Sequence, residues 1–179
     1  MGFDVVALTA NSRTDIIEEQ IRKFSPRFAA VADEKAAADL KIRVADTSTK
    51  VLSGAEGVEE CARCGADTVL NSIVGIAGLA PTLAAIEAGS KIALANKETL
   101  VAGGKIVMDA AVDRGVDILP VDSEHSALFQ SLQGCQGKSH LKRLILTASG
   151  GPFFGKTKDE LEKVTLAQAL RHPNWSMGA

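Results

Sequence analysis

Two carboxylates directly follow a short apolar run in the stretch Ile118-Leu119-Pro120-Val121-Asp122-Ser123-Glu124-His125. The apolar run predicts a buried strand, and residues 126–132 predict the start of a helix. The acids then lie at the carboxyl end of a strand, where open α/β sheets bind their ligands. Oxygen ligands on a short turn suit a hard divalent ion such as Mg²⁺ or Mn²⁺.

A helix cap is the simpler interpretation of the same stretch. Asp122 or Ser123 can accept a hydrogen bond from the first turn of the helix, and Glu124 is favoured there by the helix dipole. The stretch alone leaves both interpretations open, so the choice depends on the rest of the chain.

Short apolar runs alternate with segments of helical spacing before this stretch. The runs are continuously apolar, which is typical of parallel strands covered by helices on both faces. The predicted fold class is therefore α/β. We predict strands at 5–8, 28–32, 50–52, 68–74, 92–95 and 118–121, and helices at 14–24, 33–45, 55–64, 81–88 and 99–113.

A polar, glycine-rich segment at 133–138 predicts a domain boundary, which divides the chain into residues 1–132 and 133–179. Residues 141–147 predict a new strand after the boundary. The sequence Thr157-Lys158-Asp159-Glu160 has the pattern of a capping box, which opens a helix or helical turns as far as residue 170.

Composition narrows the function classes. A hydrophobic content of 46% over 179 residues supports a sizeable core, and a net charge of -2 gives no electrostatic case for nucleic acid or an anionic membrane. No apolar stretch is long enough to span a membrane, and no signal peptide opens the chain, so we expect a cytoplasmic protein. Cys61 and Cys64 fall within a predicted helix without a second metal-binding pair, which argues against redox or zinc chemistry.

Other segments offer chemistry, each with a structural alternative. Asn96-Lys97-Glu98 follows a strand and can also be a helix cap with solvated charges. The pair Gly75 and Gly78 lets a backbone approach a ligand, or simply makes a turn. Ser149-Gly150-Gly151 can present backbone N–H groups to a phosphate, or can be a glycine-rich strand exit. His172 lies near Trp175, although an isolated loop histidine is more often structural.

Four motifs in this order closely resemble the 1-deoxy-D-xylulose 5-phosphate reductoisomerase family. They are Ala95-Asn96-Lys97-Glu98, Pro120-Val121-Asp122-Ser123-Glu124-His125, Thr147-Ala148-Ser149-Gly150-Gly151-Pro152-Phe153 and Arg171-His172-Pro173-Asn174-Trp175-Ser176-Met177-Gly178. The resemblance implies a Rossmann-like NADPH-binding domain, followed by the start of an α+β catalytic domain.

The resemblance also implies that this chain is an internal fragment. Family members begin with a strand and a glycine-rich loop of the G-S-T-G-S-I-G type, and no such pattern precedes Phe3. They also continue beyond the motif that ends at Gly178, through an N-K-G-L-E segment and a carboxy-terminal helical domain. We therefore expect an incomplete parallel sheet without its first strand, and a fragment that is inactive alone.

The family's reaction is the NADPH-dependent rearrangement and reduction of 1-deoxy-D-xylulose 5-phosphate to 2-C-methyl-D-erythritol 4-phosphate, in non-mevalonate isoprenoid biosynthesis. The resemblance thus implies a phosphosugar substrate, Mg²⁺ or Mn²⁺, and a homodimeric parent enzyme. It assigns the metal to Asp122 and Glu124, catalytic roles to Ser123, Ser149 and His172, and substrate contacts to Ser123, Glu124, Ser149, His172, Trp175 and Met177. It assigns the cofactor to Gly75, Gly78, Asn96, Lys97 and Glu98, and more loosely to Ala10, Asn11, Ser12 and Arg13.

Arg13 is the residue in this chain suited to choosing NADPH. Its guanidinium can bind a 2′-phosphate with two parallel hydrogen bonds, and no acid in the segment 9–14 is placed to select the ribose hydroxyl of NAD. Two alternatives stay open: another Rossmann-type dehydrogenase, which would need a catalytic Cys or Lys-His arrangement that is not found, and a non-catalytic nucleotide-binding remnant.

Overall fold

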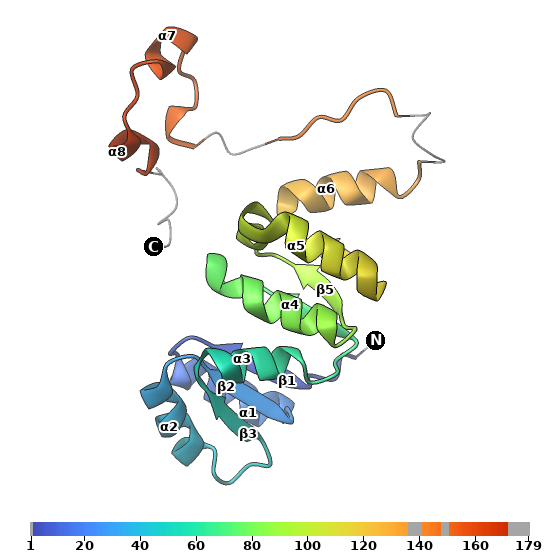
Figure 1. Ribbon diagram of the computed structural model, residues 1–179. Helices are drawn as coiled ribbons and strands as arrows, with labels where there is room; N and C mark the ends of the chain where they lie inside the picture. The colour runs from blue at the N-terminus through green and yellow to red at the C-terminus, as the bar shows by residue number, and fades with distance from the viewer. Residues whose placement is uncertain (1, 136–140, 148–150, 172–179) are drawn as a thin grey trace. The chain divides into compact units, whose positions relative to one another are not determined.

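A computed structural model describes residues 2–135, 141–147 and 151–171 of the chain (Figure 1). The chain divides into two compact units, Met1–Val121 and Asp122–Ala179. The boundary predicted after Leu132 lies further along the chain than this division, and it stays a prediction. The two units are described separately below.

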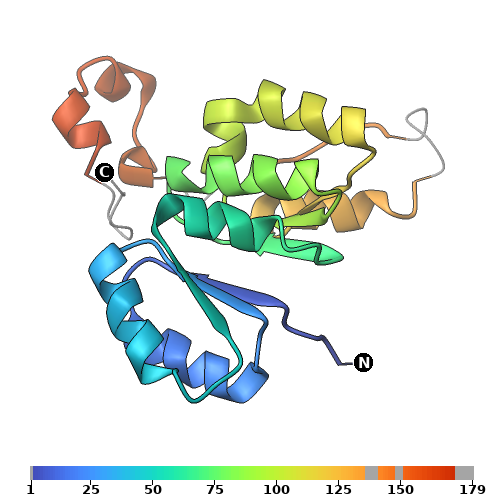
Figure 2. The same cartoon turned by 60° about the horizontal axis from the view of Figure 1, so that its bottom comes forward.

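A parallel three-stranded sheet opens the first unit, with β1 (Ala7–Ala10), β2 (Phe28–Val31) and β3 (Lys50–Ser53) in that order. The helices α1 (Thr14–Phe24) and α2 (Glu34–Arg43) lie on one face and α3 (Gly54–Ala62) on the other, as Figure 2 shows. Alternate residues of β2 divide between the faces: Ala29 and Val31 pack toward α1 and α2, and Ala30 packs toward α3. The first sheet is therefore covered on both faces, as predicted.

A second parallel sheet follows in the same unit, with the order β4 (Thr68–Asn71), β5 (Lys91–Leu94) and β6 (Ile118–Pro120). The turn η1 (Ile76–Gly78) leads into α4 (Leu79–Glu87), and α5 (Glu98–Arg114) connects β5 to β6. The core of this second sheet is formed by side chains of β5, α4 and α5, including Ile92, Ile86 and Val107. On β4, however, Leu70 is 63% exposed, so this sheet is less completely covered than the first.

No backbone hydrogen bond joins β1 to β4 within the described residues, so the six strands form two sheets rather than one. An edge of β1 and an edge of β4 are both left without a strand partner in this part of the chain. This division agrees with the predicted gap between the two halves of a Rossmann-like sheet.

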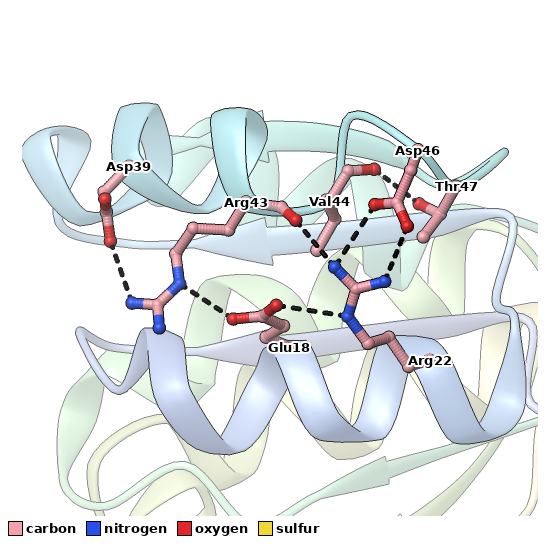
Figure 3. Close-up of polar contacts among 7 residues, drawn as sticks. All are labelled: Glu18, Arg22, Asp39, Arg43, Val44, Asp46 and Thr47. Atoms are coloured by element: carbon pink, nitrogen blue, oxygen red, sulfur yellow. Dashed lines mark hydrogen bonds and ion pairs between the residues drawn. The ribbon is translucent and has the colours of Figure 1, made fainter.

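An ion-pair network joins α1 to α2 and the turn after α2 (Figure 3). The Glu18 carboxylate accepts hydrogen bonds from Arg43 Nε at 2.7 Å and from Arg22 Nε at 3.1 Å. Arg22 also donates to Asp46 at 2.8 Å and to the carbonyl of Arg43 at 2.8 Å. Glu18 therefore bridges two arginines on different helices, and these hydrogen bonds, Arg43 first, lower the pKa of its carboxyl group.

We expect Glu18→Gln to lower the melting temperature at neutral pH, because the amide keeps the size of the side chain but loses its charge. The pKa of Glu18 is depressed by folding, so its contribution is present above the ordinary value of 4.5 and is lost as the pH falls through the folded pKa. The melting temperatures of the two proteins should therefore converge in acid. Glu19→Gln on the exposed side of α1 is the matched control, and an equal effect of both changes would contradict the bridging role.

The second unit contains short helices: α6 (Ser123–Leu132), the turn η3 (Gly151–Phe153), α7 (Lys158–Leu161) and α8 (Leu166–Ala169). The predicted capping box is confirmed, since the backbone N–H of Thr157 donates to the Glu160 carboxylate at 2.8 Å. The predicted strand at 141–147 is wrong. A strand needs a hydrogen-bonded neighbour, and the described residues supply none, so Ile145 remains 70% exposed. In the part of the chain that is described, no helix has the length and apolarity needed to cross a membrane.

Candidate functional site

Three of the predicted cofactor segments lie at carboxyl ends of strands. Residues 10–13 close β1 and lead into α1, the glycine pair follows β4, and Asn96-Lys97-Glu98 follows β5. In the second sheet the ends of β4 and β5 lie side by side, because Asn71 and Leu94 are register partners and the backbone N–H of Ala95 donates to the Asn71 carbonyl at 2.9 Å.

Arg13 is exposed before the first turn of α1, but its guanidinium is already paired. Nε and Nη2 donate to the two carboxylate oxygens of Asp15, at 2.9 and 2.8 Å. This pairing raises the pKa of Arg13, and the hydrogen bonds from Arg13 lower the pKa of Asp15. A 2′-phosphate would therefore compete with Asp15 for Arg13. Asp15 lies one residue beyond the segment 9–14, and its pairing with Arg13 becomes apparent only in the folded chain. Ala10 is the last residue of β1, and the exposed residues Asn11 and Ser12 lie between it and Arg13.

Gly75 and Gly78 lie in the loop after β4, and each position favours glycine for a different physical reason. Gly75 has φ 75° and ψ -163°, a backbone conformation that side chains strongly disfavour. A Cβ on Gly78 would meet Asn96 Nδ2 at 2.5 Å and Asn71 Nδ2 at 3.0 Å. Gly78 is therefore small because two side-chain amides of this chain pack against it.

Lys97 and Glu98 are exposed at the start of α5, whereas Asn96 is buried. The Asn96 amide nitrogen donates to the carbonyls of Ile73 and Gly75, and its oxygen accepts from the backbone N–H of Thr99 at 2.8 Å. The side chain of Asn96 is thus engaged with the protein itself, and Lys97 and Glu98 are the members of this motif with accessible charges.

The predicted metal residues open α6 in the second unit. Asp122 is the N-cap: its Oδ2 accepts a hydrogen bond from the backbone N–H of His125 at 3.4 Å and lies 2.6 Å from Nδ1 of the same residue. Ser123 Oγ donates to Glu124 Oε2 at 3.1 Å. The capping interpretation is therefore confirmed for Asp122, and it leaves carboxylate oxygens on Asp122 and Glu124 for a further ligand.

This donor set fits a hard divalent cation. Carboxylate oxygens on a rigid helix start are the ligands that Mg²⁺ and Mn²⁺ prefer. Within the described residues, no cluster of three or more His, Cys, Asp or Glu side chains forms a metal site. Asp122 and Glu124 are thus two candidate ligands rather than a complete coordination sphere.

The predictions for Ser149, His172, Trp175 and Met177 fall outside the described residues. Three residues whose side chains form hydrogen bonds near the candidate segments were not predicted from the sequence: Asn71, Thr82 and His125. Asn71 could have been recognised in the sequence, because it is a polar residue that interrupts an otherwise apolar strand. Cys61, a residue of α3, packs in the core of the first sheet, and burial raises the pKa of its thiol to about 12.

Comparison with known proteins gives consistent matches along the chain. The family model described as 1-deoxy-D-xylulose 5-phosphate reductoisomerase matches residues 1–104, and the model of that enzyme's C-terminal domain matches residues 118–179. A curated relative from Thermoanaerobacter sp. (strain X514), called 1-deoxy-D-xylulose 5-phosphate reductoisomerase, is 49% identical over 177 residues. A relative of the same name from Geotalea uraniireducens (strain Rf4) is 51% identical over 177 residues.

Solved structures match as well. The reductoisomerase from Zymomonas mobilis in complex with NADPH is similar with a TM-score of 0.81 and 40% identity, over 94% of this chain and 44% of that one. A reductoisomerase in complex with NADPH, fosmidomycin and magnesium has a TM-score of 0.76 and 41% identity, over 98% of this chain and 46% of that one.

The match to the Thermoanaerobacter relative covers 99% of this chain and 46% of the relative, so the chain spans less than half the length of the relatives that it matches. The two family models match successive parts of the chain, and the first model alone covers more than half of it. The chain belongs to the 1-deoxy-D-xylulose 5-phosphate reductoisomerase family.

Proposed function

We propose that this chain contributes the greater part of an NADPH site and two metal carboxylates to an enzyme that converts 1-deoxy-D-xylulose 5-phosphate into 2-C-methyl-D-erythritol 4-phosphate. The observation that carries the proposal is the membership of both halves of the chain in the reductoisomerase family. The solved relatives whose descriptions name NADPH and magnesium support the same cofactor and metal here.

Asp122 and Glu124 are the proposed metal ligands. A divalent ion held by these two carboxylates would act as a Lewis acid toward the carbonyl and hydroxyl oxygens of the substrate. The N-cap geometry fixes Asp122 at the start of α6, and the hydrogen bond from Ser123 orients Glu124. Ser123, adjacent to both acids, is proposed to turn its single O–H from Glu124 to the same substrate oxygens when the substrate binds.

Lys97 and Glu98 are proposed to meet the nicotinamide half of the cofactor, and the loop from Gly75 to Gly78 its central part. Both charged side chains are exposed at the start of α5. Ser149 and His172 are proposed as substrate-site residues. Trp175 and Met177 are proposed to cover that site.

Arg13 is proposed to bind the 2′-phosphate of NADPH after exchanging Asp15 for the phosphate. The role of Arg13 can be tested in a chimera in which this chain replaces the matching segment of the Thermoanaerobacter relative. Arg13→Ala should weaken NADPH binding about tenfold and leave NADH binding unchanged, because only NADPH carries the phosphate. Asp15→Asn should strengthen NADPH binding, because it releases the guanidinium from its partner.

Fluorescence titration of both cofactors against the chimera and the two variants measures these affinities. Equal weakening of NADPH and NADH by Arg13→Ala would place Arg13 away from the 2′-phosphate. Thr14→Ser, next to Arg13 on α1, keeps both charges and serves as the matched control.

The function itself is tested with the same chimera. We expect it to oxidise NADPH when 1-deoxy-D-xylulose 5-phosphate and Mn²⁺ or Mg²⁺ are both present, and to yield 2-C-methyl-D-erythritol 4-phosphate. A folded chimera that binds no NADPH would favour a non-catalytic remnant. Oxidation of NADPH with a different hydroxy or carbonyl substrate, and none with this phosphosugar, would favour another Rossmann-type dehydrogenase.

The cytoplasmic setting and the homodimer of the parent enzyme are also proposals. A reducing compartment is compatible with the free thiols Cys61, Cys64 and Cys135. Sedimentation of the chimera at several concentrations measures its oligomeric state directly.

A further inference from the structure

Three charged side chains lie along one face of α1. Asp15, Glu18 and Arg22 are spaced by three and four residues, so they are neighbours on the surface of the helix. Glu18 and Arg22 are bonded to α2 and to the turn after it. Asp15, which is nearest the start of the helix, is bonded instead to Arg13, the residue proposed to bind the 2′-phosphate.

Arg43, the last residue of α2, extends over this face of α1 (Figure 3). Its Nε donates to Glu18 at 2.7 Å and its Nη1 to Asp39 at 3.3 Å. Within the described residues its Nη2 makes no hydrogen bond. Figure 3 shows the guanidinium on the side of Glu18 that faces away from Arg22. That side leads toward Asp15, because Arg22 lies nearer the other end of the helix.

The protein holds Arg43 in this place without a ligand. Arg22 donates to the carbonyl of Arg43 at 2.8 Å, which fixes the end of α2, and to the second oxygen of Glu18 at 3.1 Å. The pKa of Arg43 is raised, first by its hydrogen bond to Glu18 and last by the negative charge of Asp15. Arg43 thus attracts Asp15 already and keeps N–H groups for a further acceptor.

The pairing of Arg13 with Asp15 creates a charge conflict for a phosphate ligand. A phosphate monoester carries roughly two negative charges, so a 2′-phosphate at Arg13 meets the Asp15 carboxylate on the same guanidinium. Two anions at one cation repel each other, and the carboxylate has to turn away. The side chain of Asp15 is 58% exposed in the first turn of α1, so it has room to rotate.

We propose that Arg43 is a specificity-determining residue for NADPH, which receives the Asp15 carboxylate when the 2′-phosphate binds Arg13. In this arrangement the cofactor touches Arg13, and Arg43 acts through Asp15 without touching the cofactor. The inference rests on the proposed function, which assigns the 2′-phosphate to Arg13. NADH has no 2′-phosphate, so it leaves the pair of Arg13 and Asp15 intact and gains nothing from Arg43.

Arg43→Gln in the chimera tests this inference. The amide removes the positive charge that receives Asp15, so we expect NADPH affinity to fall about threefold. NADH affinity should stay unchanged, because NADH does not displace Asp15. Fluorescence titration of both cofactors measures the two affinities, and the melting temperature of each variant shows whether it is folded.

A double-mutant cycle separates an effect through Asp15 from a direct attraction between Arg43 and the phosphate. Asp15→Asn removes the carboxylate that has to be moved. Arg43→Gln should therefore cause no further loss of NADPH affinity in the Asp15→Asn chimera. A loss as large in that background as in the unsubstituted chimera would overturn the proposal.

Asp39→Asn tests the same role from the opposite direction. It keeps Arg43 and the hydrogen bond to Glu18, and it releases the Nη1 group that Asp39 now engages. Arg43 should then receive Asp15 more readily, so we expect NADPH affinity to rise about twofold. This variant keeps the proposal testable if Arg43→Gln does not fold, and a folded Asp39→Asn chimera without that rise would contradict it.

Arg43→Lys and Arg27→Gln are the matched controls. Lysine keeps the charge but not the forked contacts, so NADPH affinity should stay close to that of the chimera. Arg27 lies just before β2, against the ring of Phe28, and its replacement removes one positive charge from the same unit. Arg27→Gln should change neither cofactor affinity, and a loss equal to that of Arg43→Gln would overturn the specific role of Arg43.

Failure of this inference can be distinguished from failure of the proposed function. Unchanged NADPH affinity in a folded Arg43→Gln chimera, while Arg13→Ala weakens NADPH alone, overturns the role of Arg43 and leaves the proposed function intact. Equal weakening of NADPH and NADH by Arg43→Gln indicates a structural role and also overturns it. Absence of NADPH binding in the unsubstituted, folded chimera overturns the proposed function, and this inference with it.

Discussion

Asp122→Asn and Glu124→Gln are each expected to lower kcat of the chimera by about a hundredfold to a thousandfold, while the chimera remains folded. Each substitution removes an anionic oxygen ligand and keeps the size of the side chain. Asparagine is as good an N-cap as aspartate, so Asp122→Asn preserves the start of α6 and removes only the charge. The change therefore separates the metal role from the capping role, which the sequence left open.

Mn²⁺ affinity, measured by electron paramagnetic resonance, should fall in parallel with kcat in both variants. Asp159→Asn, at an exposed position in the first turn of α7, is the control for loss of a helix-start carboxylate and should change neither quantity. Full activity together with unchanged Mn²⁺ affinity in either variant would remove that residue from the metal site.

The helices of the first unit were predictable because local signals agree there. For α1, the apolar residues at helical spacing predict the helix, and both of its bounds are confirmed. Ser25 follows with φ 48° and Pro26 comes next, so the chain cannot continue the helix. Asp33, the first residue of the predicted helix 33–45, is the N-cap of α2 and accepts a hydrogen bond from the backbone N–H of Ala36 at 2.8 Å.

Where the prediction failed, either a local side-chain hydrogen bond or the lack of a strand partner decided the outcome. The run 68–74 is apolar enough to continue as a strand, but β4 ends at Asn71, whose side chain bonds to the backbone of Ile73 and turns the loop. The run 141–147 has strand composition without a partner in the described chain. Apolar composition shows that a segment can be a strand, but strand pairing depends on residues that are remote in sequence.

The candidate site was predictable by residue type and less so by role. The motif around Asp122 indicated a helix start, which the N-cap of α6 confirms, and the metal role of Asp122 and Glu124 stays a prediction. For Arg13 and Asn96, a sequence shows donors and not which acceptors already use them. Asp15 occupies the guanidinium of Arg13, and loop carbonyls occupy the amide of Asn96.

The 179-residue chain produced alone is expected to show no turnover. Catalysis of this kind needs metal, phosphate and nicotinamide aligned in a closed site, and a misplacement of about 1 Å can already cost roughly a hundredfold in rate. In the described chain, Asp122 and Glu124 do not form a complete metal cluster, and β1 and β4 share no hydrogen bond. The match to full-length relatives covers only 46% of the Thermoanaerobacter protein.

Following the nicotinamide absorbance with substrate and Mn²⁺ present measures this directly, with the chimera as the positive control. Turnover by the chain alone above about a thousandth of an ordinary enzyme's ~10 s⁻¹ would overturn the expectation.

The surface of the second sheet gives an independent check. Leu70, Val74 and Ile76 are between 63% and 76% exposed around the end of β4, beside a strand edge without a partner. Exposed apolar side chains beside an open edge promote association, so the isolated chain should bind a hydrophobic dye and self-associate more than the chimera does. Because the two readouts are separate, a chain that is well folded and inactive can be distinguished from one that is inactive because it aggregates.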